Sequence, residues 1–293
     1  PNVVVSKNAH FSFYRCAKIL GVEVKTVGVD DQYKMDLSLT EEAIDKNTVL
    51  LVGILGSTEL GIIDDVVELD KIAFKHSLDL HLDAAIGGFI LPFLNDVDSG
   101  VYRFDKLKSL NSINISGHKF GLSLPGCGLL LLRTRKEVDK FSDTLDYLSS
   151  GEGRMEGLLV SRSSAGSFSL ALNILNYGNN GYTEFARGYA QTMKKLIEYF
   201  KSTPFKVIVG DSATPQIFIH GSNIEDLSAN LFEKGWIQAP YKPKVFTDKG
   251  IRIVIKKDQE ELLQTAFISE VESYLNKKTK PSNHLLHESK LSL

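Results

Sequence analysis

The sequence predicts an α/β fold with a mainly parallel sheet, and two observations support this. Short runs of β-branched and aliphatic residues alternate with helical patterns through the first half of the chain. One of these runs, residues 48–55, is continuously apolar, as in a strand that is buried on both faces. Strands separated by helices form right-handed crossovers, which place helices on both faces of a parallel sheet.

The elements of the first half follow in chain order. Residues 3–6 predict a strand, and residues 10–20 predict a helix that ends at Gly21. After the strand at 48–55, Asp64 or Asp65 caps a helix whose apolar positions share one face: Val66, Leu69, Ile72 and Ala73. Further strands are expected at residues 78–84, 112–116 and 127–132.

The pattern changes at about residue 165, where long helical stretches begin, interrupted by Gly178 and Gly181. Beyond Pro204, strands (206–209, 216–220, 250–256) mix with helices (223–234, 258–277). We therefore expect a large domain over residues 1–165 and bridging helices over 166–203. A small C-terminal α+β domain over 204–278 and a polar tail over 279–293 complete the expected organisation.

Composition and charge exclude several classes of protein. Hydrophobic residues make up 43% and charged residues 24% of the 293 residues, which excludes general disorder. Lys and Arg total 34 against 36 Asp and Glu, so the formal net charge is −2. Proteins that bind nucleic acid or a membrane surface usually carry a clustered basic excess, and no apolar run approaches the ~20 residues of a membrane helix. We expect neither nucleic acid nor membrane as a partner.

The cysteines, the histidines and the first residue lead to three further expectations. Cys16 and Cys127 cannot build a disulfide framework, which favours a reducing compartment and a cytoplasmic protein. Scattered histidines and the absence of a CxxC pattern predict no metal site. The chain opens on Pro1 and runs directly into an apolar strand, so we expect an upstream segment to be missing.

The densest chemical signal is SINISGHKFG, residues 112–121. A strand ends at Ser116, a glycine permits a sharp turn, and His118 and Lys119 follow together. Ligands in open α/β sheets bind at the carboxyl ends of the strands, and a partly desolvated lysine there can attack an aldehyde. The alternative is a solvated turn with an exposed lysine.

A second signal is HLDAAIGGF, residues 81–89. Asp83 ends an apolar strand, where a carboxylate needs a cationic partner such as a protonated pyridine nitrogen. Small residues such as Ala85 would let a flat ring approach the backbone. The alternative is a helix N-cap, a position that Asp fills well.

Two weaker signals complete the set. His10 in NAHFSF could stack its imidazole on a cofactor ring, or be an ordinary core or surface histidine. Thr58 in GSTELG, residues 56–61, offers a hydroxyl after a buried strand, or lies in a plain turn.

Together these four segments resemble the pyridoxal-phosphate-dependent group II amino acid decarboxylases, including glutamate decarboxylase and the archaeal tyrosine/aspartate type. The resemblance extends from AHFSF to the region around residues 250–256. It implies the type I (aspartate aminotransferase-like) fold of pyridoxal-phosphate enzymes, with a small C-terminal domain and an incomplete N-terminus. It also implies a homodimer that decarboxylates a glutamate, aspartate or tyrosine class L-amino acid to an amine and CO2.

The resemblance implies a role for each matching residue around the cofactor. Lys119 would hold pyridoxal 5'-phosphate as a Schiff base, and Asp83 would keep the pyridine nitrogen protonated. His10 and Ala85 would pack on opposite faces of the ring. The remaining contacts, to the ring region and to the phosphate, would come from Thr58, Ser116 and His118.

It also implies residues that act on the substrate. Arg252 in GIRIVI matches the family arginine that binds the substrate carboxylate, for which a guanidinium is suited by its bidentate geometry. Arg162 falls where relatives keep an arginine, with a structural ion pair as the alternative. Tyr147 lies in a segment that forms a mobile catalytic loop in relatives, and could return a proton to Cα.

Two departures from the family pattern bear on specificity and completeness. Glutamate decarboxylases carry glutamine at the position of His10, whereas the tyrosine/aspartate type carries histidine, which favours the latter lineage. The family's phosphate-binding segment lies upstream of the position matching Pro1. Two alternatives therefore stay open: a carbon–carbon lyase of the sphingosine-phosphate-lyase type, and a truncated non-catalytic subunit.

Overall fold

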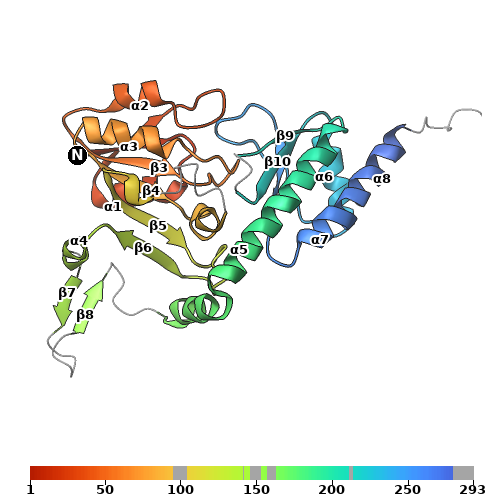
Figure 1. The fold of residues 1–293 in the computed structure, drawn as a ribbon. Helices are drawn as coiled ribbons and strands as arrows, with labels where there is room; N and C mark the ends of the chain where they lie inside the picture. The colour runs from red at the N-terminus through yellow and green to blue at the C-terminus, as the bar shows by residue number, and fades with distance from the viewer. Residues whose placement is uncertain (95–103, 141, 146–152, 157–162, 211–213, 280–293) are drawn as a thin grey trace, which may run out of the picture.

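A central sheet of six strands organises the first half of the chain in a computed structural model that describes residues 1–94, 104–140, 142–145, 153–156, 163–210 and 214–279 (Figure 1). The strand order is β2-β1-β3-β4-β5-β6. The bounds are β1 (Asn2–Ser6), β2 (Glu23–Val27), β3 (Thr48–Ile54), β4 (Asp79–Asp83), β5 (Leu110–Ser116) and β6 (Gly128–Leu132). The first five strands run parallel, as the alternating pattern predicted.

The predicted strand at residues 127–132 is present, but it runs antiparallel to β5. Parallel neighbours need a crossover of about a dozen residues or more, usually a helix. The connection from Gly117 to Cys127 instead folds into tight turns that hold the strand ends together, with the amide of Gly117 bonded to the carbonyl of Cys127 at 3.1 Å. β2 was not predicted, because its EVKTV sequence is partly exposed and polar.

Helices cover both faces of the sheet. Helix α1 (Phe11–Leu20) packs over Val5, Val52 and Ile54 on one face. Helix α3 (Val66–Lys75) covers the other face, where the core includes Val4, Leu51, Leu80 and Leu82. The short helix α2 (Leu37–Ala43) lies beside α3 and was not predicted. Since successive strand residues point to opposite faces, the two clusters alternate along each strand.

The helix ends differ slightly from the sequence prediction. His10 is the N-cap of α1 rather than its first residue, and Gly21 ends the helix in a left-handed conformation with φ 67°. Asp65 caps α3 by accepting from the amide of Glu68. Its neighbour Asp64 is buried and accepts from the backbone amides of Met35 and Ile54, so it ties a loop to the end of β3.

Shorter elements lie between β4 and β5 and after β6. They are the 3-10 turns η1 (Gly87–Phe89), η2 (Leu91–Phe93) and η4 (Phe104–Lys106), helix α4 (Arg135–Asp139), and the antiparallel pair β7 (Ser142–Leu145) and β8 (Gly153–Glu156). The β7–β8 pair was not predicted from the sequence.

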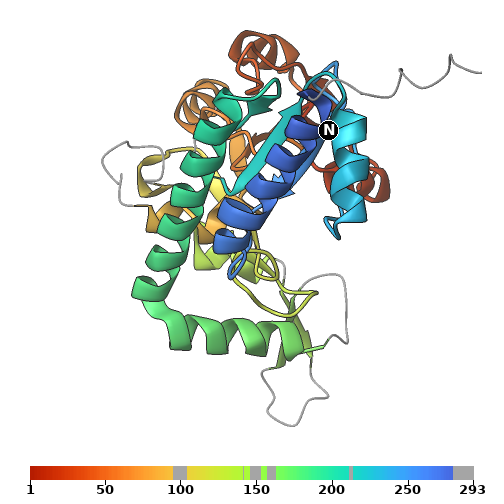
Figure 2. The same ribbon diagram turned by 90° about the vertical axis from the view of Figure 1, so that its right-hand side faces the viewer.

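Helix α5 (Ala165–Lys201) bridges the two halves of the molecule and bends sharply at Gly178. Gly178 has φ 56° and ψ −163°, a conformation that only glycine adopts readily. Figure 2 shows the two arms of α5 running in different directions from this bend. Gly181, the second predicted interruption, lies within the helix.

The C-terminal part contains a three-stranded antiparallel sheet in the order β11-β10-β9, with bounds β9 (Lys206–Ile208), β10 (Gln216–His220) and β11 (Gly250–Val254). The second arm of α5 packs against this sheet together with α6 (Ile224–Glu233) and α8 (Ile268–Thr279). The helix predicted over 258–277 is divided into α7 (Glu260–Leu262), a π-helical turn (Leu263–Phe267) and α8.

Hydrogen bonds join the two sheets at the turn of residues 57–61. The side chain of Gln216 donates to the carbonyl of Ser57 at 2.5 Å, and Thr214 donates to the carbonyl of Gly61 at 2.6 Å. Arg252 donates to the carbonyl of Thr58. The turn is therefore held from the C-terminal sheet, although it follows β3 of the central sheet. In the described part of the chain, no helix is long and apolar enough to cross a membrane.

Candidate functional site

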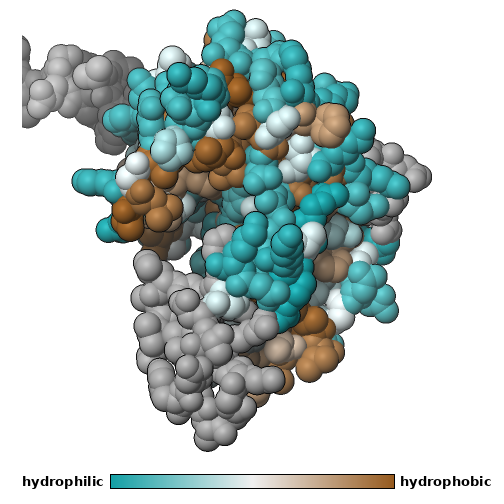
Figure 3. Space-filling model, turned by 90° about the vertical axis from the view of Figure 1, so that its left-hand side faces the viewer, coloured by the Kyte–Doolittle hydropathy of each residue, from teal (hydrophilic) through white to brown (hydrophobic). Residues whose placement is uncertain are grey.

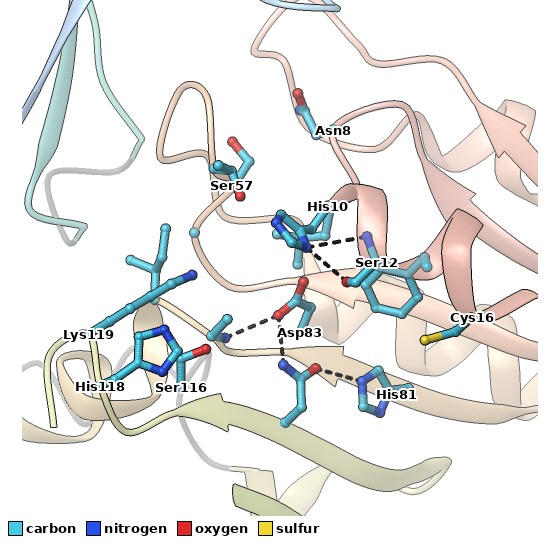
Figure 4. Close-up of a pocket in the computed structure, with 17 residues that line it drawn as sticks. Asn8, His10, Ser12, Cys16, Ser57, His81, Asp83, Ser116, His118 and Lys119 are labelled. Carbon is cyan, nitrogen blue, oxygen red and sulfur yellow. Dashed lines mark hydrogen bonds between the residues drawn. The ribbon is translucent and has the colours of Figure 1, made fainter. Parts of the chain in front are cut away.

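A cavity of about 480 Å3 lies at the carboxyl ends of β4 and β5, on the face of the sheet that α1 covers (Figure 4). It is lined by seven of the ten residues singled out from the sequence: His10, Thr58, Asp83, Ala85, Ser116, His118 and Lys119. A second cavity of about 660 Å3 shares Thr58, Ile86, His118 and Lys119 with the first. Its volume is within the range of small-molecule sites.

Asp83 is the last residue of β4 and is buried, with 7% of its surface exposed. Its Oδ1 accepts from the backbone amide of Ala85 at 3.1 Å and from the Asn114 side chain at 3.0 Å. Within the described residues its Oδ2 accepts no hydrogen bond, and the side chain faces the cavity. Asp83 precedes a turn and η1 rather than an α-helix, so the helix N-cap alternative does not apply.

Lys119 is half-buried on the turn that follows β5, and its side chain reaches into the cavity (Figure 4). Burial lowers the pKa of Lys119, the carboxylate of Asp83 opposes that change, and the nearby Arg252 adds to it. A lysine with a lowered pKa holds more of its amine in the neutral, nucleophilic form. The solvated-turn alternative therefore does not describe this side chain.

His10 stands at the N-terminus of α1 and lies over Asp83 in the cavity (Figure 4). Its Nδ1 accepts from the Ser12 amide at 3.4 Å and lies 2.8 Å from the Ser12 hydroxyl. Burial, and then the charge of Lys119, lower the pKa of His10. A neutral imidazole held by its Nδ1 presents a flat face that can stack on another ring.

The other predicted contacts surround these three residues. Ala85 and Thr58 lie on turns that follow β4 and β3, and Ser116 is the last residue of β5. His118 donates through Nδ1 to the carbonyl oxygen of Cys127 at 3.1 Å, since a carbonyl can only accept. Its Nε2 is consequently the ring nitrogen that is free to face a ligand.

The predicted substrate residues are only partly brought to this site. Arg252, on β11, lines the second cavity and bonds to the Thr58 carbonyl, so it is not the plain exposed strand residue of the alternative interpretation. Arg162 and Tyr147 lie outside the described residues.

Sequence reasoning missed several polar residues in the same cavity. His81 and Asn114 line it from β4 and β5 and are bonded to each other, while Asn8 and Ser57 lie at the opposite wall. Ser112 does not line the cavity but is bonded to His81. The signal for His81, Asn114 and Ser112 was present in the sequence. His81 lies two positions before Asp83, and Ser112, Asn114 and Ser116 are also two positions apart. Residues at this spacing share one face of a strand.

The arrangement fits pyridoxal phosphate. Asp83 offers a buried carboxylate oxygen for a protonated pyridine nitrogen, and Lys119 offers an amine for an aldehyde. His10 and Ala85 leave space for a flat ring beside the sheet. In the residues that the structure describes, no group of three or more His, Cys, Asp or Glu side chains is arranged to hold a metal ion.

Known proteins resemble this chain in sequence over most of its length. The family model of the pyridoxal-dependent decarboxylase conserved domain matches residues 1–219. A probable L-aspartate decarboxylase from Archaeoglobus fulgidus is 31% identical over 278 residues, covering 94% of this chain and 73% of the relative. A probable L-tyrosine/L-aspartate decarboxylase from Methanosarcina barkeri is 36% identical over 272 residues, covering 90% and 66%. The chain thus spans about two thirds to three quarters of the length of these relatives.

Solved structures give the same picture of the fold. Glutamate decarboxylase from Lactobacillus brevis superimposes with a TM-score of 0.85 at 26% identity, covering 100% of this chain and 68% of that one. A sphingosine-1-phosphate lyase from Burkholderia pseudomallei gives 0.81 at 21% identity, covering 94% and 63%, a likeness of fold alone. The fold is the type I fold that these enzymes share.

Proposed function

Because the chain belongs to the pyridoxal-dependent decarboxylase family, whose cofactor is pyridoxal phosphate, we propose that it decarboxylates an L-amino acid. One observation carries the proposal: the carboxylate of Asp83 and the amine of Lys119 line a single cavity at the carboxyl ends of adjacent strands. Those two groups are the ones that this chemistry requires at opposite ends of the cofactor ring.

Each residue of the cavity has a defined task in this proposal. Lys119 would hold the cofactor through its amine, and its lowered pKa would keep more of that amine in the neutral, nucleophilic form. Asp83 would hold the proton on the pyridine nitrogen, and His10 and Ala85 would pack against the ring. Ser116, His118 and Thr58 contact the cofactor around its edge. When bound, the cofactor supplies an electron sink for the bond that breaks.

Arg252 binds the substrate carboxylate in the proposal. It lines the second cavity together with Lys119. The charges of Arg252 and Asp83 both affect the pKa of Lys119, so the three groups lie close enough to interact. A guanidinium can orient the carboxylate so that the bond to be broken is aligned with the cofactor ring. Arg162 and Tyr147 are assigned by resemblance, Tyr147 as the group that returns a proton.

The relatives' names favour aspartate or tyrosine as the substrate over glutamate. The test is to incubate the protein and pyridoxal phosphate with each of the three amino acids and to measure CO2 and the amine. We expect amine and CO2 in equal amounts from at least one of them. In Arg252→Leu, we expect the rate of amine and CO2 formation to fall about 10–100-fold, because the hydrogen bonds between charged groups are removed.

Two other results would contradict the proposal. An aldehyde product without CO2 would instead indicate a carbon–carbon lyase. No product from any amino acid, with the cofactor bound, would indicate a non-catalytic subunit.

We further propose a cytoplasmic homodimer. Large apolar side chains are exposed on α1 and on the first arm of α5, including Phe11 at 59%, Phe168 at 66% and Leu175 at 82%. Figure 3 shows hydrophobic patches among hydrophilic areas on one face of the molecule. Extended apolar surface of this kind usually marks an interface. Sedimentation velocity should give a dimer for the wild type and a monomer for Leu175→Asp; a wild-type monomer would contradict the proposal.

A further inference from the structure

A line of hydrogen bonds runs along β4 and β5 behind Asp83. The Ser112 hydroxyl lies 2.8 Å from Nδ1 of His81, and Nε2 of His81 lies 2.7 Å from Oδ1 of Asn114. The Asn114 amide nitrogen then lies 3.0 Å from Oδ1 of Asp83. These side chains share one face because His81 and Ser112 are paired across the two strands, as are Asp83 and Asn114. Figure 4 shows the last two bonds.

The direction of each bond follows from its acceptor. A carboxylate only accepts, so Asn114 donates its amide to Asp83 and turns its own oxygen toward His81. That oxygen also only accepts, so the proton of the neutral imidazole is on Nε2. Nδ1 of a neutral His81 is then an acceptor, and the Ser112 hydroxyl can donate to it. All three donors point toward Asp83.

We propose that His81 is a positioning residue that acts through Asn114 to hold the Asp83 carboxylate in the orientation required by the cofactor's pyridine nitrogen. The inference rests on the proposed function, because it assigns Asp83 to that nitrogen. Among the described residues, both hydrogen bonds to Asp83 fall on Oδ1, which leaves Oδ2 for the cofactor. Without His81, the Asn114 side chain loses the partner that fixes which of its ends faces Asp83.

The surroundings of His81 suit this task. Burial lowers the pKa of His81, and only the weaker effects of Asn114 and Asp83 oppose that change. The imidazole therefore stays neutral and keeps a single proton to donate. The ring of Phe13, on α1, packs edge-on with its centre 6.0 Å from that of His81, which restricts rotation of the imidazole.

The first test compares His81→Leu with His81→Gln. Leucine fills similar space but donates nothing, whereas the glutamine amide can replace the Nε2 proton. We expect about tenfold weaker binding of pyridoxal phosphate for His81→Leu and near wild-type binding for His81→Gln. His220→Leu, a histidine outside both cavities, is the matched control and should leave binding unchanged.

A second readout is the pH midpoint of the visible absorbance of the bound cofactor. A pyridine nitrogen that is less firmly protonated withdraws fewer electrons, so the Lys119 nitrogen attached to the ring becomes more basic. The midpoint should move to higher pH in His81→Leu and return toward the wild-type value in His81→Gln. A purely structural role would lower thermal stability without moving this midpoint.

A double-mutant cycle tests whether His81 acts through Asn114. Asn114→Leu should weaken cofactor binding at least as much as His81→Leu, and the double variant should bind no more weakly than Asn114→Leu alone. Additive effects, or an unchanged midpoint in His81→Leu, would overturn the inference.

The same measurements separate the inference from the proposed function. If the wild type forms no absorbance band with pyridoxal phosphate, the proposed function fails and the inference fails with it. If the wild type forms the band and the His81 and Asn114 variants match it, only the inference fails. Nitrogen NMR of the imidazole in the cofactor-free protein should give the neutral Nε2–H form, with the signal identified by its loss in His81→Leu. The Nδ1–H form would also overturn the inference.

Discussion

Asp83 and Asp64 are both buried carboxylates, but they have different roles because they accept different hydrogen bonds. Asp83 accepts two hydrogen bonds on one oxygen and turns the other toward the cavity. Asp64 uses both oxygens to accept backbone amides, from Met35 and Ile54, and serves the local fold. A single residue type therefore supports a ligand at one position and a loop at the other.

Replacement of Asp83 by Asn should weaken pyridoxal phosphate binding by about 10–100-fold, because hydrogen bonds to charged groups contribute about 1.5–3 kcal/mol. Asn preserves the shape but cannot carry the charge that faces a pyridinium. Asp70→Asn is the matched control: Asp70 is also buried, but it binds the amides of Lys108 and Ser109 away from the cavity. Titration of cofactor fluorescence measures both, and equal losses in the two variants would contradict the role of Asp83.

Asp64 predicts a pH dependence of stability. Burial raises its pKa from 3.8 to about 7. Between about pH 4 and 7 the folded state therefore binds more protons than the unfolded state, and this group's contribution to the free energy of unfolding falls as pH rises. Relative to Asp64→Asn, the wild type should lose at most about 1.4 kcal/mol per pH unit over that window. Urea unfolding of both proteins gives the difference; a difference that is constant or grows with pH would argue against this account.

At the residue scale, the sequence predicted Asp83 and Lys119 as candidates but not their supporting partners. Asp83 ends an apolar strand and is followed by small residues, and Lys119 lies in a glycine-containing turn after a strand; both are local patterns. Asn114 and His81 matter only because β4 and β5 pair in a particular register, and that register is a long-range property.

At the scale of elements, helix α5 bends sharply at Gly178, and its two arms run in different directions. Gly178 was expected to interrupt the helix because glycine disfavours helix interiors. Gly181 was expected to do the same, but it lies in the helical second arm that begins after the bend. The strand β6 was predicted, but its antiparallel direction was not, because periodicity indicates that a strand exists and not which way it runs.

Gly178→Ala should destabilise the protein by about 1–3 kcal/mol through backbone strain alone. An added Cβ would meet no atom within 4 Å, so no steric clash contributes. Gly188→Ala, in the helical second arm of α5, should instead stabilise by about 0.5–1 kcal/mol, because alanine loses less conformational freedom than glycine in a helix. Its Cβ would make only an ordinary contact with Glu260 at 3.6 Å. Chemical denaturation measures both free energies, and a neutral Gly178→Ala would show that the bend is not imposed at this residue.

At the scale of the whole molecule, the cavity depends on both sheets. The turn of residues 57–61 belongs to the central sheet but is bonded by Gln216, Thr214 and Arg252 from the C-terminal part. The sequence predicted two structural units and could not predict this junction, because it joins residues more than 150 positions apart. The boundaries at residues 165 and 204 stay a prediction, as does the homodimer.

Gln216→Met should lower both stability and cofactor affinity. It leaves the Ser57 carbonyl without its buried donor, at a cost of about 1–3 kcal/mol, and Ser57 lines the cavity. Gln264→Met breaks a bond to Thr192 within the C-terminal part and should lower stability only. Thermal unfolding and cofactor titration distinguish the two variants. Unchanged cofactor affinity in Gln216→Met would show that the hydrogen bond to Ser57 does not support the cofactor site.

The central claim is that Lys119 holds pyridoxal phosphate in the cavity with Asp83. The most direct measurement is borohydride reduction of the protein with bound cofactor, followed by mass spectrometry of its peptides. We predict that the pyridoxyl label lies on Lys119 alone, and that Lys119→Ala loses both the label and the visible absorbance band. A label on another lysine, or a band that persists in Lys119→Ala, would contradict the account.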